Sequence, residues 1–259
     1  MDNQIFLDFA LKTVKKTRSF IQTKIETGFN VSTKKDHSLV TEVDKETEKL
    51  IRQEIEKKFP DHGIVGEEFG TKNEKAKFKW FLDPIDGTLS FSNRIPLYGT
   101  ILALHRENEP IVGVIDHPGL NQSCYALKDR GAFLNGKKIT VKDIDSLEDL
   151  KKEIIATGDI IQFKLVKEEA LYEKLLKEHE FTRTIPDCFG HTLAAQGSVG
   201  AMVDFDLSPW DLAATKLIIE EANGKFKLFK KTQLPNGTAK QNVIFGKPKV
   251  VDWLCEILG

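Results

Sequence analysis

Residues 80–91 read WFLDPIDGTLSF, in which a short apolar run leads directly into two carboxylates, Asp83 and Asp86. Pro84 lies between the two acids, and Gly87 and Thr88 follow them. This pattern predicts a buried strand that ends in acidic residues, then a tight turn, then the start of a helix. Carboxylate oxygens suit Mg²⁺, and the first amides of a helix suit an anion. The stretch therefore indicates chemistry on a phosphate.

The same residues also form a good turn without any ligand. Proline presets its own φ, Asp side chains bond back to the chain, and Gly87 tolerates a positive φ. The stretch by itself leaves a metal site and an ordinary turn open as alternatives. Acids elsewhere in the chain bear on the choice between them.

Three further acids stand at the ends of predicted elements. Glu67 ends the apolar strand predicted at residues 63–66, and strand ends are where sites collect in layered folds. Asp211 lies at a predicted helix start, where capping alone would also explain it. Asp44 is a possible cap of another helix. Each acid has a local explanation, but together with Asp83 they favour a shared site.

Apolar periodicity divides the chain into helices and strands. We expect helices at residues 3–27, 44–58, 167–177, 191–196, 210–222 (with Ser208 as the N-cap) and 250–258. We expect strands at residues 63–66, 78–82, 100–105, 110–116, 123–127, 154–156, 181–185, 199–205, 226–229 and 243–245. The pattern predicts a layered α+β or α/β fold, with strands and helices alternating after a boundary near residues 143–153. We expect two packed subdomains, at residues 1–147 and 148–259.

Composition and charge exclude several classes of protein. The 259 residues carry 38 Lys and Arg against 39 Asp and Glu, a net charge of −1 that disfavours binding to nucleic acid or an anionic membrane. No stretch approaches the ~20 apolar residues of a membrane span, and residues 1–9 lack the apolar region of a secretory signal. The cysteines, Cys124, Cys188 and Cys255, are odd in number and far apart, which predicts buried free thiols in a reducing cytoplasm.

Four blocks of sequence together resemble the inositol monophosphatase superfamily. They are Val40-Thr41 to Asp44, Gly66-Glu67-Glu68, Asp83-Pro84-Ile85-Asp86-Gly87-Thr88, and Trp210-Asp211-Leu212-Ala213-Ala214 with Glu221-Ala222. Their order and spacing hold over nearly the whole chain, and Asn223 stands where the family usually has glycine. The resemblance implies an αβαβα sandwich, a metal-dependent phosphoric monoester hydrolase that acts through an activated water, and a homodimer.

The resemblance also implies a role for each matched residue. The implied ligands of two or three Mg²⁺ ions are Glu67, Asp83, Asp86, Asp211 and the backbone carbonyl of Ile85. The implied catalytic residues are Glu67, at the ion that carries the attacking water, and the pair Asp44 and Thr88, which would orient and deprotonate that water. The implied substrate-binding residues are Gly87, Thr88, Leu89, Asp187, Asp204 and Asp211, the first three through backbone amides that hold the phosphate.

The segment Pro186-Asp187-Cys188-Phe189-Gly190-His191 bears on which small phosphate monoester is the substrate. It lacks the Ser-x-Gly-Thr/Ser-Ala pattern of inositol phosphatases and resembles the Asp-containing segment of histidinol-phosphate phosphatases. Asp187 and Asp204 would then face a cationic alcohol, although Asp187 also reads as a turn residue. We expect His191 on the helix surface or at its cap, since the proposed metals are hard.

Several functions stay open at this point. Histidinol phosphate is favoured slightly over inositol 1-phosphate, with fructose 1,6-bisphosphate and 3′-phosphonucleotides as further options. A non-catalytic binder of phosphometabolites is the alternative from a different class, and Asp44 with Thr88 argues against it because binding alone needs no water activation. The net charge disfavours a nucleic-acid-binding protein.

Overall fold

The computed structural model describes residues 3–34, 38–146, 148–233 and 239–259. The helices of this part are α1 (Gln4–Thr27), α2 (Glu42–Lys58), α3 (Thr88–Ser92), α4 (Ile160–Leu165), α5 (Glu169–Glu178), α6 (Asp187–Ala195), α7 (Thr215–Glu221) and α8 (Pro248–Leu258), with short 3₁₀ turns at Pro118–Leu120 and Asp149–Lys152. No helix in these ranges is long and apolar enough to cross a bilayer. The three cysteines are free, as expected, and Cys255 is only partly buried.

The larger sheet has eight strands in the order β10-β9-β8-β7-β6-β5-β3-β4. They are β3 (Gly63–Gly66), β4 (Gly70–Lys72), β5 (Phe78–Asp86), β6 (Gly99–Arg106), β7 (Glu109–His117), β8 (Gln122–Leu127), β9 (Gly131–Leu134) and β10 (Lys137–Ile139). Only β3 and β5 run parallel to each other in this sheet. A separate hairpin pairs β1 (Val31–Thr33) with β2 (Leu39–Thr41).

The smaller sheet has five strands in the order β12-β11-β13-β15-β14. They are β11 (Ile155–Thr157), β12 (Thr182–Thr184), β13 (Ala201–Leu207), β14 (Lys225–Gln233) and β15 (Ala239–Gly246). The described chain passes from one sheet to the other between β10 and β11. The division at residues 147 and 148 stays a prediction, and residue 147 lies outside the described ranges.

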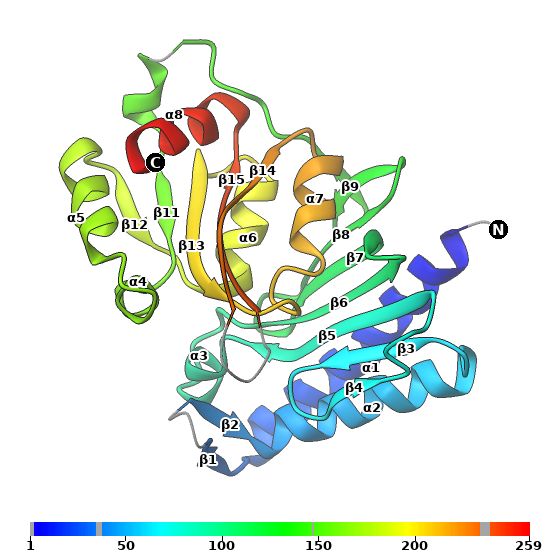
Figure 1. Ribbon diagram of the computed structural model, residues 1–259. Coiled ribbons are helices and arrows are strands. Elements are labelled where there is room, and N and C mark those ends of the chain that lie inside the picture. The colour runs from blue at the N-terminus through cyan, green and yellow to red at the C-terminus, as the bar shows by residue number, and fades with distance from the viewer. Residues whose placement is uncertain (1–2, 35–37, 147, 234–238) are drawn as a thin grey trace.

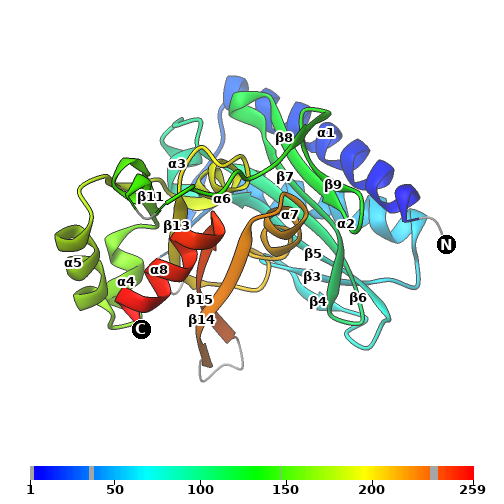
Figure 2. The ribbon, with the colours of Figure 1, turned by 90° about the horizontal axis from the view of Figure 1, so that it is seen from above.

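The elements stack in five layers (Figure 1). Helices α1 and α2 cover the outer face of the larger sheet, and α4, α5 and α8 cover the outer face of the smaller one. Figure 2 shows α6 and α7 between the two sheets. This arrangement is the αβαβα sandwich that the sequence leads us to expect.

Strand β6 shows how the residue pattern builds these layers. Its side chains point alternately to the two faces of the sheet, and all four central ones are fully buried. Ile101 and Ala103 join the core formed with α6 and α7, whereas Leu102 and Leu104 join the core formed with α1 and α2. Apolar residues on both faces are required because helices cover this sheet on both sides.

Several predicted helix starts differ from the structure, and α6 begins at Asp187, four residues before the expected start at residue 191. Helix α2 begins after Thr41, which is the N-cap, so Asp44 is not the cap but the third residue of a capping box. Helix α7 begins at Thr215 rather than at residue 210, so its N-cap is Ala214 and not Ser208, although Ser208 N does donate a hydrogen bond to Asp211 Oδ2 at 2.7 Å. The carbonyl of Ala213, which a helix would use internally, is hydrogen-bonded instead to His105 Nε2 at 3.0 Å.

The parallel pairing of β3 with β5 positions the acidic residues. In the register of this pair Gly66 lies opposite Leu82, so that Glu67 and Asp83 follow at the same edge of the sheet. Strand β5 also runs further than residue 82, where the sequence predicts its end, and its irregular last residues carry Asp83 and Asp86. The acids therefore project from the carboxyl ends of neighbouring strands.

Candidate active site

A cavity of about 480 Å³ opens beside the ends of β3 and β5. Eight of the residues to which the resemblance gives a metal-binding, catalytic or substrate-binding role line it: Glu67, Asp83, Ile85, Asp86, Gly87, Thr88, Asp187 and Asp211. Glu67 follows β3, residues 83–88 end β5 and begin α3, Asp187 begins α6, and Asp211 follows β13. The fold thus brings residues from four separate parts of the chain to one cavity.

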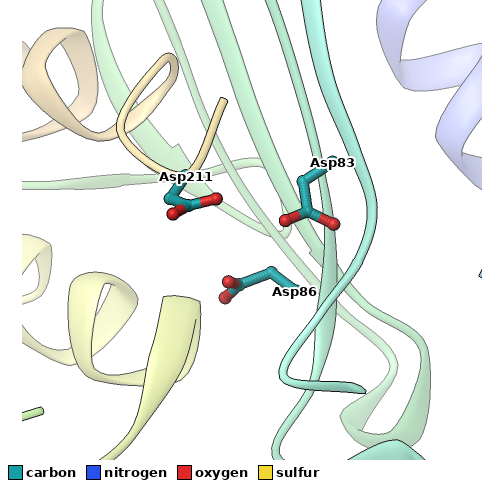
Figure 3. Close-up of side chains that lie close together, drawn as sticks. All are labelled: Asp83, Asp86 and Asp211. Atoms are coloured by element: carbon teal, nitrogen blue, oxygen red, sulfur yellow. The ribbon is translucent and has the colours of Figure 1, made fainter. Parts of the chain in front are cut away.

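Three carboxylates at the centre of the cavity converge on a common space (Figure 3). One oxygen each from Asp83, Asp86 and Asp211 lies within 4.8 Å of the other two. Backbone N–H groups orient all three carboxylates: Ile85 N donates to Asp83 at 3.0 Å, Cys188 N to Asp86 at 2.5 Å, and Ser208 N to Asp211 at 2.7 Å. The lone pairs that remain form an oxygen set of the kind that Mg²⁺ prefers.

The electrostatics of these acids favour cation binding. Burial, followed by the neighbouring carboxylates, raises the pKa of Asp83 and of Asp86 well above the usual value. Burial also raises the pKa of Asp211 to about 7, with Ser208 opposing the shift and Glu67 adding to it. Like charges held this close in a buried site cannot all ionise without help. A divalent cation would supply the missing positive charge, so the residues present fit the metals that the resemblance implies.

The raised pKa values predict a pH dependence of stability for the metal-free protein. A carboxyl with a higher pKa in the folded state binds protons on folding, so stability falls as pH rises from the unfolded pKa near ~4 towards the folded value of about 7 for Asp187 and Asp211. We expect the Tm in EDTA to fall between pH 5 and pH 8, and excess Mg²⁺ to raise it more at pH 8. Circular-dichroism melting curves measure both. An EDTA curve that is flat or rising over this range would contradict the buried acid cluster.

Glu67 enters the cavity paired with a lysine that the sequence reasoning does not identify. Lys34 Nζ, just after β1, lies 2.8 Å from Glu67 Oε1 and 2.6 Å from Glu68 Oε1. Burial lowers the pKa of Lys34, but the two glutamates outweigh it and raise that pKa above its ordinary value. Burial also raises the pKa of Glu67, against the effect of Lys34. Lys34 therefore partly neutralises the acidic rim of the cavity.

Glu48 on α2 holds the turn that presents Glu67. Its carboxylate is fully buried, accepts hydrogen bonds from the amides of Glu68 and Phe69 at 2.8 and 3.1 Å, and pairs with Arg52 at 2.8 Å. This contact requires the absence of a side chain at Gly66, where a Cβ would lie 2.2 Å from Glu48 Oε1. An acid at a buried helix position, four residues before an arginine, is the sequence signal that could identify Glu48.

Asp44 and Thr88 form the pair that the resemblance implies. Thr88 Oγ1 lies 3.1 Å from Asp44 Oδ1 and 3.1 Å from the carbonyl oxygen of Ile85. The other Asp44 oxygen accepts hydrogen bonds from the amide, at 2.9 Å, and the hydroxyl of Thr41. Burial raises the pKa of Asp44 in spite of these bonds, which makes its carboxylate a stronger base.

Asp187 lies directly against the turn after β5. Gly87 has φ +83°, and a Cβ there would lie 2.9 Å from Asp187 Oδ2. Asp187 itself has φ +57° at the start of α6, an unusual conformation for a residue other than glycine and one found at functional sites. Burial, with the charges of Asp204 and Asp211 next, raises the pKa of Asp187 to about 7.

The structure does not place the remaining predicted substrate residues on the cavity wall. Asp204 is buried behind His191, whose Nε2 lies 2.9 Å from Asp204 Oδ2 and whose Nδ1 lies 2.9 Å from Thr215 Oγ1. The expectation that His191 lies on the surface or caps a helix is wrong, because His191 is buried and lines the cavity. The side chain of Leu89 points into solvent, 63% exposed, so only its amide could serve the site.

Comparison with known proteins agrees with this geometry. The family model described as "Inositol monophosphatase family" matches residues 2–257. A histidinol-phosphatase of Chlorobaculum parvum is 37% identical over 223 residues, which cover 86% of this chain and 84% of that protein. A fructose-1,6-bisphosphatase/inositol-1-monophosphatase of Aquifex aeolicus is 31% identical over 235 residues, with 88% and 84% covered.

A solved structure shares the architecture over the full length. The IMPase of Thermotoga maritima matches with a TM-score of 0.84 and 30% sequence identity, covering 100% of this chain and 97% of that one. The five layers and the order of elements described above are therefore those of known phosphatase structures.

Proposed function

This chain belongs to the inositol monophosphatase family of phosphatases, and from this premise we propose that it is a Mg²⁺-dependent phosphomonoesterase. The observation that carries the proposal is a single cavity lined by the carboxylates of Asp83, Asp86 and Asp211 and by Thr88, whose hydroxyl lies 3.1 Å from the carboxylate of Asp44 buried behind it. A cation site alone would account for the binding of a phosphate ester. Hydrolysis also needs a group that accepts a proton from the attacking water, and the pair of Thr88 and Asp44 would supply it.

In this proposal the acids would hold two or three Mg²⁺ ions. The ligands would be Glu67, Asp83, the carbonyl of Ile85, Asp86 and Asp211. When bound, such ions neutralise the charge of a phosphate dianion and make a water molecule more acidic. Backbone amides of Gly87, Thr88 and Leu89, at the start of α3, would orient the phosphate oxygens.

Proton transfer would run through the threonine. Thr88 Oγ1 would accept the proton of the attacking water while its own proton passes to Asp44 Oδ1, 3.1 Å away. The raised pKa of the buried Asp44 carboxyl favours this direction of transfer. The phosphoryl group would pass to the water in line with the departing alcohol, with no covalent bond to the protein.

We favour histidinol phosphate as the substrate. Asp187 lines the cavity, with Asp204 buried behind His191, and an ammonium or imidazolium group beside Asp187 would favour the ionised form of its carboxyl, whose pKa burial raises to about 7. The similarity to the histidinol-phosphatase of Chlorobaculum parvum supports this choice. Inositol 1-phosphate or fructose 1,6-bisphosphate is the alternative, supported by the relative from Aquifex aeolicus.

Replacing Asp187 with asparagine should separate these substrates. Asparagine tolerates the positive φ at this position better than alanine does, so the backbone is preserved while the charge is lost. We expect kcat/KM for histidinol phosphate to fall about 10- to 100-fold, and that for inositol 1-phosphate less than about threefold. Both esters are measured on one preparation, so any unfolding cancels in the ratio. Equal losses on both would remove the reason for favouring histidinol phosphate.

A phosphate-release panel in excess Mg²⁺ tests the function itself. The esters are histidinol phosphate, inositol 1-phosphate, fructose 1,6-bisphosphate and 3′-phosphoadenosine 5′-phosphate. We expect turnover of at least one, with histidinol phosphate fastest. Stoichiometric binding of an ester without phosphate release would favour a non-catalytic binder instead.

We also propose that the protein acts in the cytoplasm as a homodimer. Two of the three free cysteines, Cys124 and Cys188, are fully buried, which is typical of a reducing compartment. The homodimer rests on the family resemblance alone.

A further inference from the structure

His117 ends strand β7 and is fully buried, but it does not line the cavity. Its imidazole contacts two residues of α6 that lie four positions apart, on one face of that helix. Nε2 lies 2.8 Å from Thr192 Oγ1, and Nδ1 lies 3.9 Å from Cys188 Sγ. The ring of Phe189 meets the imidazole at nearly a right angle, with centroids 5.9 Å apart. One buried side chain of the larger sheet thus contacts the first two turns of α6.

The hydrogen bonds of His117 determine which ring nitrogen carries the proton. Burial lowers the pKa of His117 to about 4, in spite of the Tyr98 carbonyl, so the imidazole is neutral at pH 7. Nδ1 lies 3.2 Å from the carbonyl oxygen of Tyr98, which can only accept, so Nδ1 donates and Nε2 accepts from the hydroxyl of Thr192. The contact with α6 is therefore a directional hydrogen bond between neutral groups.

Gly99 at the start of β6 allows α6 to approach the larger sheet this closely. A Cβ at position 99 would lie 2.6 Å from Cys188 Sγ and 3.1 Å from His117 Nδ1. Gly99 also pairs with Asp86 in the register of β5 with β6. The contact between His117 and α6 is therefore made beside the strand position that carries Asp86.

The first turn of α6 serves the cavity through a backbone amide and a side chain. The amide of Cys188 donates to Asp86 Oδ2 at 2.5 Å, and Asp187 lines the cavity. Because Asp86 belongs to the larger sheet and Cys188 to a helix between the sheets, this hydrogen bond depends on where α6 rests on the sheet (Figure 2). His117, on the same sheet as Asp86, bonds to α6 one turn further on, at Thr192.

We propose that His117 is a positioning residue for the metal site, which holds α6 where the Cys188 amide can orient Asp86. The inference rests on the proposed phosphatase function and adds to it a residue outside the cavity. Carboxylates that bind a metal are themselves held by hydrogen bonds, and loss of such support typically lowers metal affinity 10- to 100-fold. His117 acts through the helix, so the lower end of that range applies.

The test is a calorimetric titration of the full chain with Mg²⁺ alone, without substrate. We expect His117→Leu, which removes both hydrogen bonds, to raise the Mg²⁺ concentration at half-saturation about 10-fold. His117→Gln, which keeps an acceptor and a donor, should raise it less than about threefold. In phosphate release, the Mg²⁺ concentration for half-maximal rate should rise by the same factor, with the rate at saturating Mg²⁺ changed less than about threefold.

Thr192→Val perturbs the same hydrogen bond from the helix side. It removes the hydroxyl, keeps the shape of the side chain and should weaken Mg²⁺ binding as His117→Leu does. The double variant should bind Mg²⁺ no more weakly than either single variant, because both changes remove one interaction. If His117→Leu fails to fold, Thr192→Val provides the comparison with the wild-type protein.

His179, which follows α5, provides a matched control. It is also buried, its Nε2 lies 2.7 Å from the carbonyl oxygen of Glu153, and it does not line the cavity. His179→Leu should lower the Tm in EDTA and leave Mg²⁺ binding unchanged. This control separates a general loss of stability from an effect on the metal site.

The outcomes distinguish this inference from the function on which it rests. Wild-type Mg²⁺ affinity in folded His117→Leu and Thr192→Val, or an equal loss of affinity in His179→Leu, would overturn the role of His117 alone. A wild-type protein that binds Mg²⁺ but releases phosphate from no ester would overturn the phosphatase function, while the titrations still decide the role of His117. A wild-type protein that binds no Mg²⁺ would overturn both.

Discussion

Asp83→Asn should lower kcat/KM for every hydrolysed ester by about a thousandfold or more, because the proposed metal site would lose the charge of a central oxygen ligand. Metal assistance is worth several kcal/mol, and about 1.4 kcal/mol corresponds to a factor of ten in rate. Asp83 suits this test because its carboxylate meets those of Asp86 and Asp211 within 4.8 Å. Phosphate release under saturating Mg²⁺ provides the measurement.

Asp83→Asn should still fold, and its melting temperature is the second measurement that tests this. Replacing one of several buried like charges removes repulsion, so the Tm in EDTA should stay the same or rise at neutral pH. The increase in Tm that Mg²⁺ gives the wild-type protein should largely disappear, since bound ligand stabilises the folded state by mass action. Asp252→Asn, at an exposed acid on α8, is the control for which rate and metal response should not change. Wild-type kcat in folded Asp83→Asn protein would refute the metal site.

Thr88→Ala should lower kcat by about 10²- to 10⁴-fold while leaving KM and the Mg²⁺-dependent rise in Tm nearly unchanged. The reason is that, in the proposed mechanism, the hydroxyl would connect the attacking water to Asp44, and it does not belong to the carboxylate cluster. Thr88→Ser keeps the hydroxyl and should retain most of the activity. Steady-state kinetics and melting curves with and without Mg²⁺ separate these effects.

Thr88 is a better target than Asp44 for this question. Asp44 also completes the capping box of α2, so its loss would cost stability, typically about 1 kcal/mol, besides any effect on catalysis. Thr88→Ala activity equal to that of Thr88→Ser would show that the hydroxyl carries no proton. A parallel loss of the Mg²⁺ response would mean that Thr88 acts through the metals rather than on the water.

Much of the fold follows from local patterns, as particular elements show. The unbroken apolar run of β6 predicts a strand that is buried on both faces, and the apolar residues of α1 and α2, at helical spacing, predict which face of each helix is buried. The stretch at residues 80–91 predicts the acidic strand end. The resemblance to the inositol monophosphatase superfamily adds the αβαβα layering, which the similar solved structure confirms.

The rest depends on contacts between distant parts of the chain. The residues near Ala213 in the sequence do not indicate that its carbonyl oxygen is hydrogen-bonded to His105, or that α7 begins only at Thr215. The position of Asp204 behind His191 comes from the packing of α6 on the smaller sheet. Lys34 is one lysine among many in the sequence, and only folding brings it to Glu67.

The contact between Glu48 and the turn after β3 has an evolutionary consequence. Any side chain at position 66 would displace the Glu48 carboxylate and release the amides of Glu68 and Phe69, next to Glu67. A side chain at position 66 therefore requires a change at position 48, so that substitutions at the two positions are epistatic. Descendants of this sequence that keep the activity and acquire a side chain at position 66 should also carry a substitution at position 48.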